Sequence, residues 1–582
     1  MAKMQEALDV NEAITATQVV PSYVFPAPSS FLPPKSWVST ATVRKPLPRL
    51  RYRPDAKTRR YDRQLRLWAS SGQKSLEQAR ILLVGCDATG CQALKNLVLP
   101  GISHFTILSS NVTTSQDVAT NFFLHPTSIG RPIASEAVRH LKELNPAVEG
   151  ESNVNDPTIL LETNPEFFLS FTLIITSNLP PSLELQIADL LWSGPDIPLI
   201  GIRSSGFIGR VEIQLREHCI VDTHPETNHT LRIYQPFPAL EEYAVGLDID
   251  GMDSMDYSHI PWVVLLVRLA SQWKKDHGGN LPNNDEEKTA FKQLLKSGKR
   301  KGDEENFDEA LTQVYRVWNK SDVSYEIKSL MEDESIKNIS VNSKNLHILL
   351  HTLSQYLLTP PHLPPLSPTL PDMHSSTTSY IVLQNLFKRQ HRSDLQLFRQ
   401  TLSSTLEKIG LPEDAIPDQE VEGFVRNIGG VGIVKGSSLS ERRELKGLIV
   451  STIEESFAPG GYLSIPCAMH FALMACERYY SLYGGFPGSG EGDDVAEDTR
   501  KVEEIVGEMV RGVVSLQILP DEVIESIAEI IRGGFGTLPT TAALLGGVVA
   551  QETIKLITAQ YAPLDNTVVF DLIKSQSEKW KF

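Results

Sequence analysis

The chain has 582 residues, enough for several domains, and a formal net charge of −16. This acidic balance excludes nucleic acid as a main partner, because phosphate binding requires clustered positive charge. We expect no membrane span, since Arg268 interrupts the apolar stretch at residues 262–269. The five cysteines form no C-x-x-C pair, so we expect neither a metal site nor a disulfide framework, and a reducing compartment is the simplest interpretation.

Residues 1–56 carry no clear hydrophobic period. Prolines recur through the segment and break any helix, and its end is basic, between Arg44 and Arg53. The composition favours a disordered, Pro-rich tail. An organelle-targeting peptide or a docking arm are the alternatives.

Residues 57–260 are predicted to form the first part of an α/β domain. Residues 80–85 predict a buried strand that leads into a turn and then a helix at 91–99, which is how a dinucleotide-binding fold opens. Such a turn normally carries several glycines, so that backbone N–H groups can approach a phosphate. Here Asp87, Ala88 and Thr89 hold the middle positions, and a carboxylate at a helix N-terminus competes with a phosphate for the positive end of the dipole. We therefore predict a Rossmann-like domain that does not use ATP in the usual way.

Further strands are predicted at residues 105–108, 171–176 and 198–202, with helices at 134–144 and 182–192 between them. Strands that alternate with helices indicate a parallel sheet covered on both faces. A β-rich piece follows at residues 208–215 and 219–222.

Residues 261–525 are predicted to be mostly helical. Apolar residues recur at helical spacing in residues 262–273, 286–295, 306–318 and 346–358. Proline- and glycine-rich breaks at residues 360–368 and 484–494 predict surface loops.

The α/β pattern returns in residues 526–582, with a helix at 540–560 and a strand at 567–571. The helix contains Gly546 and Gly547, which predicts close packing against another backbone. A mostly helical insert thus interrupts the α/β domain.

Several segments together resemble the activating enzymes for ubiquitin-like proteins, from residue 57 to the end. The segments are YDRQLRLW at 61–68, residues 90–102, NFFL at 121–124 and AQETIK at 550–555. Within that family, residues 88–90, 188–192, 236–238 and 380–385 are most similar to the regulatory, non-catalytic subunits of neddylation-activating enzymes. The resemblance implies a ThiF/MoeB-type adenylation domain.

The resemblance also implies that this chain has lost the groups that hold ATP and magnesium in the family's catalytic halves. The glycines of the phosphate turn fall on Asp87 and Ala88, and the acids that bind the ribose fall on Ser109 and Asn111. The signature arginine falls on Thr120, and the lysine that binds phosphate falls on Ile133. No acid for magnesium follows the strand at 171–176. We expect a pseudo-adenylation domain that binds no cofactor alone, with ATP and Mg²⁺ held by a partner subunit.

No cysteine is predicted to be catalytic, so the helical insert resembles a catalytic-cysteine domain without its nucleophile. Cys467 and Cys476 lie in an apolar helix, and Cys86 and Cys91 flank the turn, as packing residues would. Cys219, beside His218, keeps a nucleophile role as an alternative.

Arg63 is the one predicted nucleotide-contacting residue. In the family, the corresponding arginine reaches across the dimer to the phosphates of ATP bound by the other subunit, a task that suits a planar, always charged guanidinium. Arg66 is a lesser candidate, and a solvated surface charge is the alternative for both. By resemblance alone, the candidates for the partner interface are Tyr380, Leu383, Gln384, Asn385 and Phe387.

Three functions remain open from the sequence. The first is an obligate non-catalytic subunit of the activating enzyme, which pairs with a catalytic subunit and acts on a ubiquitin-like modifier in the cytoplasm and nucleus. The second is an independent Rossmann oxidoreductase. The third is a scaffold that never contacts nucleotide. The second function needs an acid after the second strand to hold the ribose, and Ser109 to Asn111 supply none. Related frames also serve the SUMO and ubiquitin systems.

Overall fold

The computed structural model describes residues 55–582, except residues 225–230, 321, 459, 491–493 and 516–517. Residues 1–54 of the predicted tail at 1–56 therefore lie outside the described residues. Residues 491–493 of the predicted loop at 484–494 also lie outside them.

An eight-stranded sheet is the frame of the α/β part, in the order β10-β9-β6-β5-β4-β1-β2-β3 among the described strands. Their bounds are β1 (Arg80–Val84), β2 (His104–Leu108), β3 (Glu149–Asn153), β4 (Leu173–Ser177), β5 (Leu199–Ser205), β6 (Ile208–Gln214), β9 (Thr567–Asp571) and β10 (Gln576–Trp580). Strands β3, β2, β1, β4 and β5 pair in parallel, whereas β6, β9 and β10 add antiparallel neighbours. The last two strands come from the end of the chain, so the Rossmann-like fold with an insert is confirmed.

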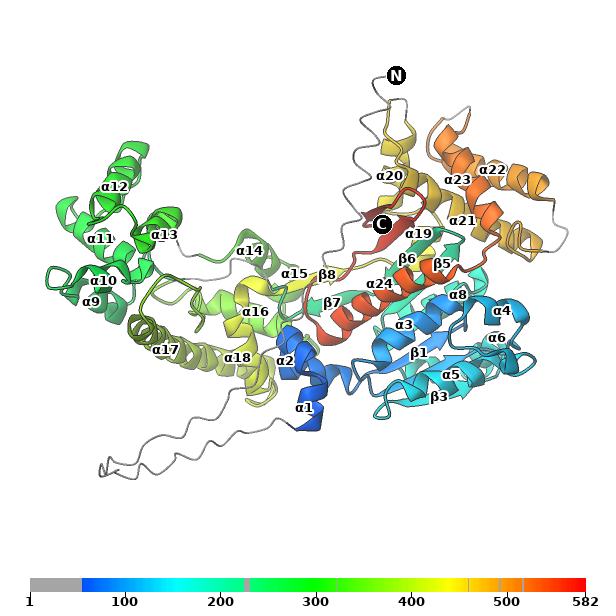
Figure 1. Cartoon of the computed structure of the whole chain (residues 1–582), viewed down its shortest axis with the longest axis horizontal. Coiled ribbons are helices and arrows are strands. Elements are labelled where there is room, and N and C mark those ends of the chain that lie inside the picture. Colours follow the sequence, from blue (N-terminus) through cyan, green and yellow to red (C-terminus); the bar gives the residue numbers. More distant parts are fainter. Residues whose placement is uncertain (1–54, 225–230, 321, 459, 491–493, 516–517) are drawn as a thin grey trace, which may run out of the picture. The chain divides into compact units, whose positions relative to one another are not determined.

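Helices cover this sheet, and Figure 1 shows α24 running alongside α3. The helices of the α/β part are α1 (Ala56–Arg60), α2 (Asp62–Leu76), α3 (Ala88–Val98), α4 (Ser115–Thr120), η1 (Pro126–Ser128), α5 (Ile133–Glu143), α6 (Pro157–Thr163), α7 (Glu166–Leu169), α8 (Pro181–Ser193) and α24 (Pro539–Thr558). A Cβ on Gly546 of α24 would lie 2.6 Å from the Cβ of Gln92 and 2.8 Å from the backbone nitrogen of Ala93. Close packing is therefore confirmed for Gly546, but it is wrong for Gly547, which faces open space.

The insert is mostly helical, with one small sheet of β7 (Glu217–Ile220) and β8 (Gly432–Lys435). Its helices are α9 (Pro238–Gly246), α10 (Ser254–Ser258), α11 (Trp262–Asp276), α12 (Asp285–Ser297), α13 (Glu305–Gln313), η2 (Val314–Val317), α14 (Tyr325–Met331), α15 (Glu334–Lys337), α16 (Asn345–Tyr356), α17 (Thr377–Ile409), α18 (Asp418–Arg426), η3 (Ile428–Gly430), α19 (Leu439–Arg443), α20 (Leu448–Phe457), α21 (Ile465–Tyr483), α22 (Val495–Arg511) and α23 (Asp521–Gly533). Among the helices that the structure describes, none is long and apolar enough to cross a membrane.

Helix α17 joins two hydrophobic cores of the insert. Leu383 and Phe387 near its start pack with α9 and α11, whereas Leu395 and Phe398 pack with α16 and α18. The helix has 33 residues and ends at Gly410, whose φ of 78° suits a left-handed helix cap. Its length escapes sequence analysis because a polar stretch interrupts the apolar pattern midway.

The proline-rich segment at residues 360–368 is only partly on the surface, contrary to the prediction. Leu363 and Leu366 are 1% and 0% exposed. The buried backbone finds side-chain partners, since Arg232 donates to the carbonyl of Pro364 at 2.9 Å and Asp394 accepts from the N–H of Leu366 at 2.9 Å. A buried ion pair between Arg232 and Asp394, 2.8 Å long, fixes both groups.

Candidate functional site

The turn after β1 keeps the geometry of a phosphate-binding turn. Gly85 has a φ of +91°, and a Cβ there would lie 2.6 Å from the carbonyl oxygen of Ser177. Only glycine fits such a position without strain. Helix α3 then begins directly after Asp87, so its free backbone N–H groups point into the turn.

The carboxylate of Asp87 occupies the place that a phosphate would take. Its Oδ1 accepts from the N–H of Gly90 at 2.8 Å and from the hydroxyl of Ser177 at 2.7 Å. Its Oδ2 accepts from the amide of Asn178 at 2.7 Å. Asn178 in turn accepts from the N–H of Ser204 at 2.9 Å, so the anion ties together the ends of β1, β4 and β5. The positive end of α3 is therefore already neutralised by the chain itself.

A pocket of about 610 Å³ opens beside this carboxylate, at the carboxyl ends of the strands. This is the crevice where a doubly wound sheet binds its ligand, because β2 and β4 lie on opposite sides of β1. The charged residues that line it are Asp87, Asp117, Glu529 and Arg532, and Arg532 pairs with Glu529 at 2.5 Å. The lining is therefore acidic on balance, which repels a polyphosphate.

The structure brings only some of the predicted nucleotide positions together. Thr120 and Ala88 line the pocket with Asp87. Ile133, which holds the place of the phosphate-binding lysine, is buried in the core at 3% exposure. Ser109 is buried as well and Asn111 is exposed, and neither lines the pocket. Where the family places a magnesium-binding acid, the structure has the amide of Asn178.

No cysteine is set up as a nucleophile in the described part of the chain. Cys86, Cys91, Cys467 and Cys476 are buried. Burial raises the pKa of Cys467 to about 12 and that of Cys219 to about 11. Burial also lowers the pKa of His218, the neighbour of Cys219, to about 4, so this imidazole carries no charge that could stabilise a thiolate.

Arg63 lies on α2, which precedes β1 in the sequence, and its side chain is exposed. It makes no hydrogen bond or ion pair with the residues that the structure describes, whereas Arg66 pairs with Asp62 at 3.1 Å. Helix α2 breaks at Trp68 and Ala69, and Gln560 donates to the carbonyl of Trp68 at this break, at 3.1 Å. The exposed guanidinium of Arg63 can reach a ligand outside this chain.

The predicted interface residues on α17 divide into two groups. Leu383 and Phe387 are 0% exposed in the chain's own core, where Phe387 packs edge-to-face on Phe237. Their side chains have no free surface for a partner, so the prediction is corrected for these two. Tyr380 and Gln384 are half-buried and Asn385 is exposed, and for them the interface stays a prediction.

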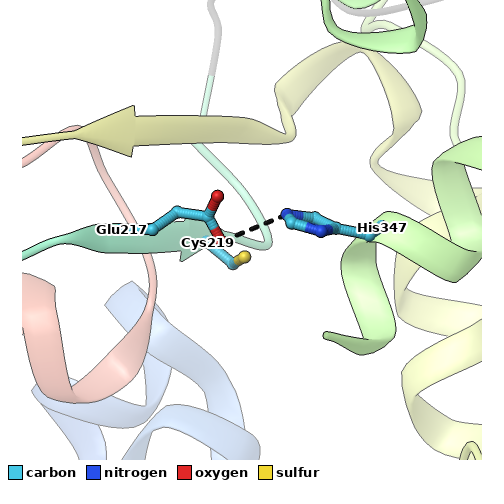
Figure 2. Close-up of side chains that lie close together, drawn as sticks. All are labelled: Glu217, Cys219 and His347. Carbon is cyan, nitrogen blue, oxygen red and sulfur yellow. Dashed lines mark ion pairs between the residues drawn. The ribbon is translucent and has the colours of Figure 1, made fainter. Parts of the chain in front are cut away.

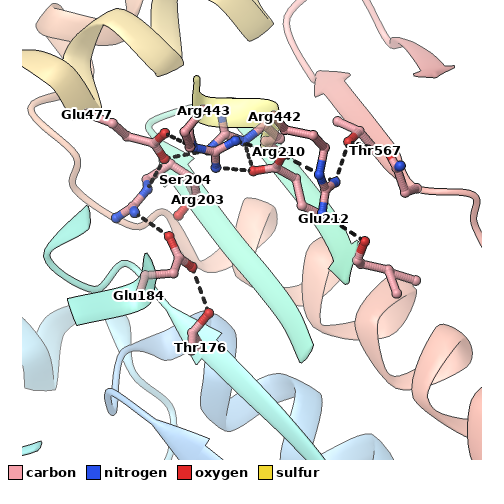
Figure 3. A network of polar contacts seen from close by, with 12 residues as sticks. Thr176, Glu184, Arg203, Ser204, Arg210, Glu212, Arg442, Arg443, Glu477 and Thr567 are labelled. Atoms are coloured by element: carbon pink, nitrogen blue, oxygen red, sulfur yellow. Dashed lines mark hydrogen bonds and ion pairs between the residues drawn. The ribbon is translucent and has the colours of Figure 1, made fainter. Parts of the chain in front are cut away.

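A buried network of charges, which sequence analysis missed, joins the sheet to the insert (Figure 3). Glu477 on α21 contacts Arg203 at 3.0 Å, Arg443 at 2.8 Å and also Arg210. Glu212 on β6 contacts Arg210 at 2.9 Å and also Arg443. Although burial opposes its charged form, Arg210 and Arg443 hold the pKa of Glu212 well below its usual range.

Together these features define a Rossmann-like, adenylation-type domain whose phosphate position is filled by its own carboxylate. The sequence pattern of the ThiF family matches residues 61–582. NEDD8-activating enzyme E1 regulatory subunits from Xenopus laevis and Drosophila melanogaster are 33% and 34% identical, over 90% of this chain and 98% and 97% of those proteins. The NEDD8-activating enzyme E1 regulatory subunit AXR1 of Arabidopsis thaliana is 32% identical, over 90% of this chain and 96% of that protein. The chain therefore belongs to the ThiF family, in its group of NEDD8-activating enzyme E1 regulatory subunits.

Proposed function

We propose that this chain is the regulatory, non-catalytic subunit of a heterodimeric activating enzyme for NEDD8. It supports ATP-dependent adenylation and thioester formation by a catalytic partner subunit. The observation that carries the proposal is the Asp87 carboxylate, which occupies the N-terminus of α3 and is held there by Gly90, Ser177 and Asn178. A site filled in this way does not bind ATP, so this chain alone holds no cofactor, and ATP with Mg²⁺ belongs to the partner.

Arg63 is the group by which this chain takes part in the reaction. Its guanidinium is exposed and without a partner among the described residues, on a helix that packs against α24. In the heterodimer it donates to a phosphate of the ATP that the partner holds, where a planar fork can bond two oxygens. Neither nucleic acid nor a membrane takes part, and the complex works in the cytoplasm and nucleus.

The test is ATP–pyrophosphate exchange by the purified chain, by the catalytic subunit and by their one-to-one mixture. We expect exchange only with the catalytic subunit present, and light scattering should show a heterodimer. Robust exchange by the chain alone would overturn the proposal. A stable homodimer that ignores the partner would do the same.

The variant Arg63→Ala distinguishes this function, in which the chain contributes to the partner's active site, from the second candidate function, a pure scaffold. A charged hydrogen bond is worth about 1.5–3 kcal/mol, so the heterodimer should lose roughly 10- to 100-fold in ATP-dependent rate or affinity. Arg63→Lys should restore only part of this loss. Arg59→Ala, which removes an exposed arginine of α1, is the matched control. If Arg63→Ala and Arg59→Ala give the same ATP titration, the chain is a scaffold.

A further inference from the structure

Three side chains of different chemistry meet beside the small sheet of the insert (Figure 2). Glu217 and Cys219 are two apart on β7, so their side chains leave the same face of the strand. His347 comes from the first turn of α16, far along the chain. One carboxylate oxygen, the thiol sulfur and one imidazole nitrogen all lie within 4.8 Å of one another. The small sheet and the helix thus contribute to one cluster.

The imidazole of His347 is the clearest sign of a missing ligand. Its side chain is 8% exposed, and its Nε2 points at Glu217, 3.1 Å from Oε1. Despite this distance, Nε2 makes no hydrogen bond of good geometry with any described residue. A buried polar atom without such a bond requires an explanation, and a metal ion is one. Glu217 and Cys219 are half-buried, so an ion can enter from solvent.

The donor set selects the ion. Thiolate, imidazole and carboxylate together are typical of zinc, whereas calcium and magnesium prefer oxygen alone. Zinc bonds of about 2.0–2.3 Å place tetrahedral ligands roughly 3.3–3.8 Å apart, so small side-chain movements close the site. Three protein ligands leave the fourth position for a water molecule.

Lys344 is a cation beside the cluster, with Nζ 3.1 Å from Oε1 of Glu217. Its ammonium also donates to the backbone carbonyl of Glu217 at 2.8 Å and lies 3.7 Å from the carboxylate of Asp196. It therefore keeps partners when the Glu217 side chain turns to a metal ion.

We propose that Glu217, Cys219 and His347 form a zinc site that fastens β7 to α16. The site lies outside the nucleotide pocket. Cys219 loses its proton to solvent when zinc binds, and the resulting thiolate bonds to the ion. The proposal does not depend on the proposed function.

Cobalt titration of the purified, metal-free full chain tests the site, because a thiolate bound to Co²⁺ gives a near-ultraviolet charge-transfer band. We expect one cobalt per chain, displaced by zinc, and a higher melting temperature with zinc. Cys219→Ser should abolish the band. His347→Gln removes a direct ligand and should lower the affinity for cobalt by at least about 10- to 100-fold, which is the loss that removal of an outer-shell partner causes.

Cys467→Ser is the matched control, since it removes a buried thiol of α21 that packs in a different hydrophobic core from Cys219. It should keep both the band and the stoichiometry. Circular dichroism identifies the folded variants, and His347→Gln decides if Cys219→Ser does not fold. No charge-transfer band in the folded wild type at saturating cobalt would overturn the proposal. A band that survives both ligand substitutions would show cobalt held elsewhere and would also overturn it.

Discussion

Replacing Asp87 by alanine tests whether its carboxylate organises the pseudo-nucleotide site. The change removes the N-cap of α3, which is worth about 1 kcal/mol. It also removes the acceptor of Ser177 and Asn178. Asn178 lines the adjoining pocket, where water can hydrate its amide, so this loss should cost about 0.5–1.5 kcal/mol. Ser177 is buried and does not line the pocket, so leaving its hydroxyl unpaired should cost about 1–3 kcal/mol. Asp87→Ala should therefore lower the free energy of unfolding by roughly 2.5–5.5 kcal/mol.

Urea unfolding followed by intrinsic fluorescence gives the measurement, and Asp156→Ala is the control. Asp156 caps α6 through the N–H groups of Thr158 and Ile159 and is exposed, so its removal costs the cap alone, about 1 kcal/mol. Asp87→Asn keeps one oxygen for the cap and for Ser177, but it places an NH2 donor where Oδ2 accepts from Asn178, so it should fall between these two variants. None of the variants should bind ATP. Equal losses for Asp87→Ala and Asp156→Ala would refute the argument that the carboxylate ties the strand ends together.

Three further predictions follow from buried groups. Glu477→Gln should cost about 3–5 kcal/mol of unfolding free energy, because it leaves buried guanidinium groups without a counter-charge. The control Glu504→Gln changes a side chain that is 61% exposed and should cost under about 1 kcal/mol, so similar losses in denaturant titrations would contradict the prediction. Burial lowers the pKa of His470 well below its usual range, so the unfolded chain binds this proton at a higher pH than the folded chain does. Wild type should therefore lose more unfolding free energy than His470→Phe as the pH falls through about 6.5, and parallel pH profiles would count against this. Gly546→Ala should destabilise the chain through its clash with α3, whereas Gly547→Ala should stabilise it by about 0.5–1 kcal/mol, and thermal melting of the two variants should give shifts of opposite sign.

The sequence was most informative where one element carries its own signal. The strands β1 and β9 are apolar runs, and both could be predicted within a residue of their bounds. The edge strand β3, Glu149–Asn153, is polar and largely exposed, so no hydrophobic alternation marks it. Asp87 could be placed at the helix N-terminus because the turn and its neighbours are contiguous in sequence.

Contacts between distant segments could not be predicted in the same way. Glu477 and Arg203 meet in the buried network, although hundreds of residues separate them in the sequence. Glu217 and His347 also meet, although they are 130 residues apart in the sequence. A charged residue in a single sequence predicts a solvated surface, and only the fold shows which charges are taken out of water together. The resemblance predicts Leu383 and Asn385 on α17 equally as interface residues. Only the fold shows that Leu383 is buried in the chain's own core whereas Asn385 is exposed.

The position of β9 in the sheet has a consequence for biosynthesis. β6 pairs with β9, and the ribosome makes β9 only after the whole insert. At about 5–20 residues per second, roughly 20–70 s pass between the two strands. Throughout that interval the nascent chain presents the open edge of β6, with its unpaired N–H and C=O groups, to other chains. Protection of this edge on the ribosome, by a chaperone or by the emerging helices, is therefore a requirement of the chain order itself.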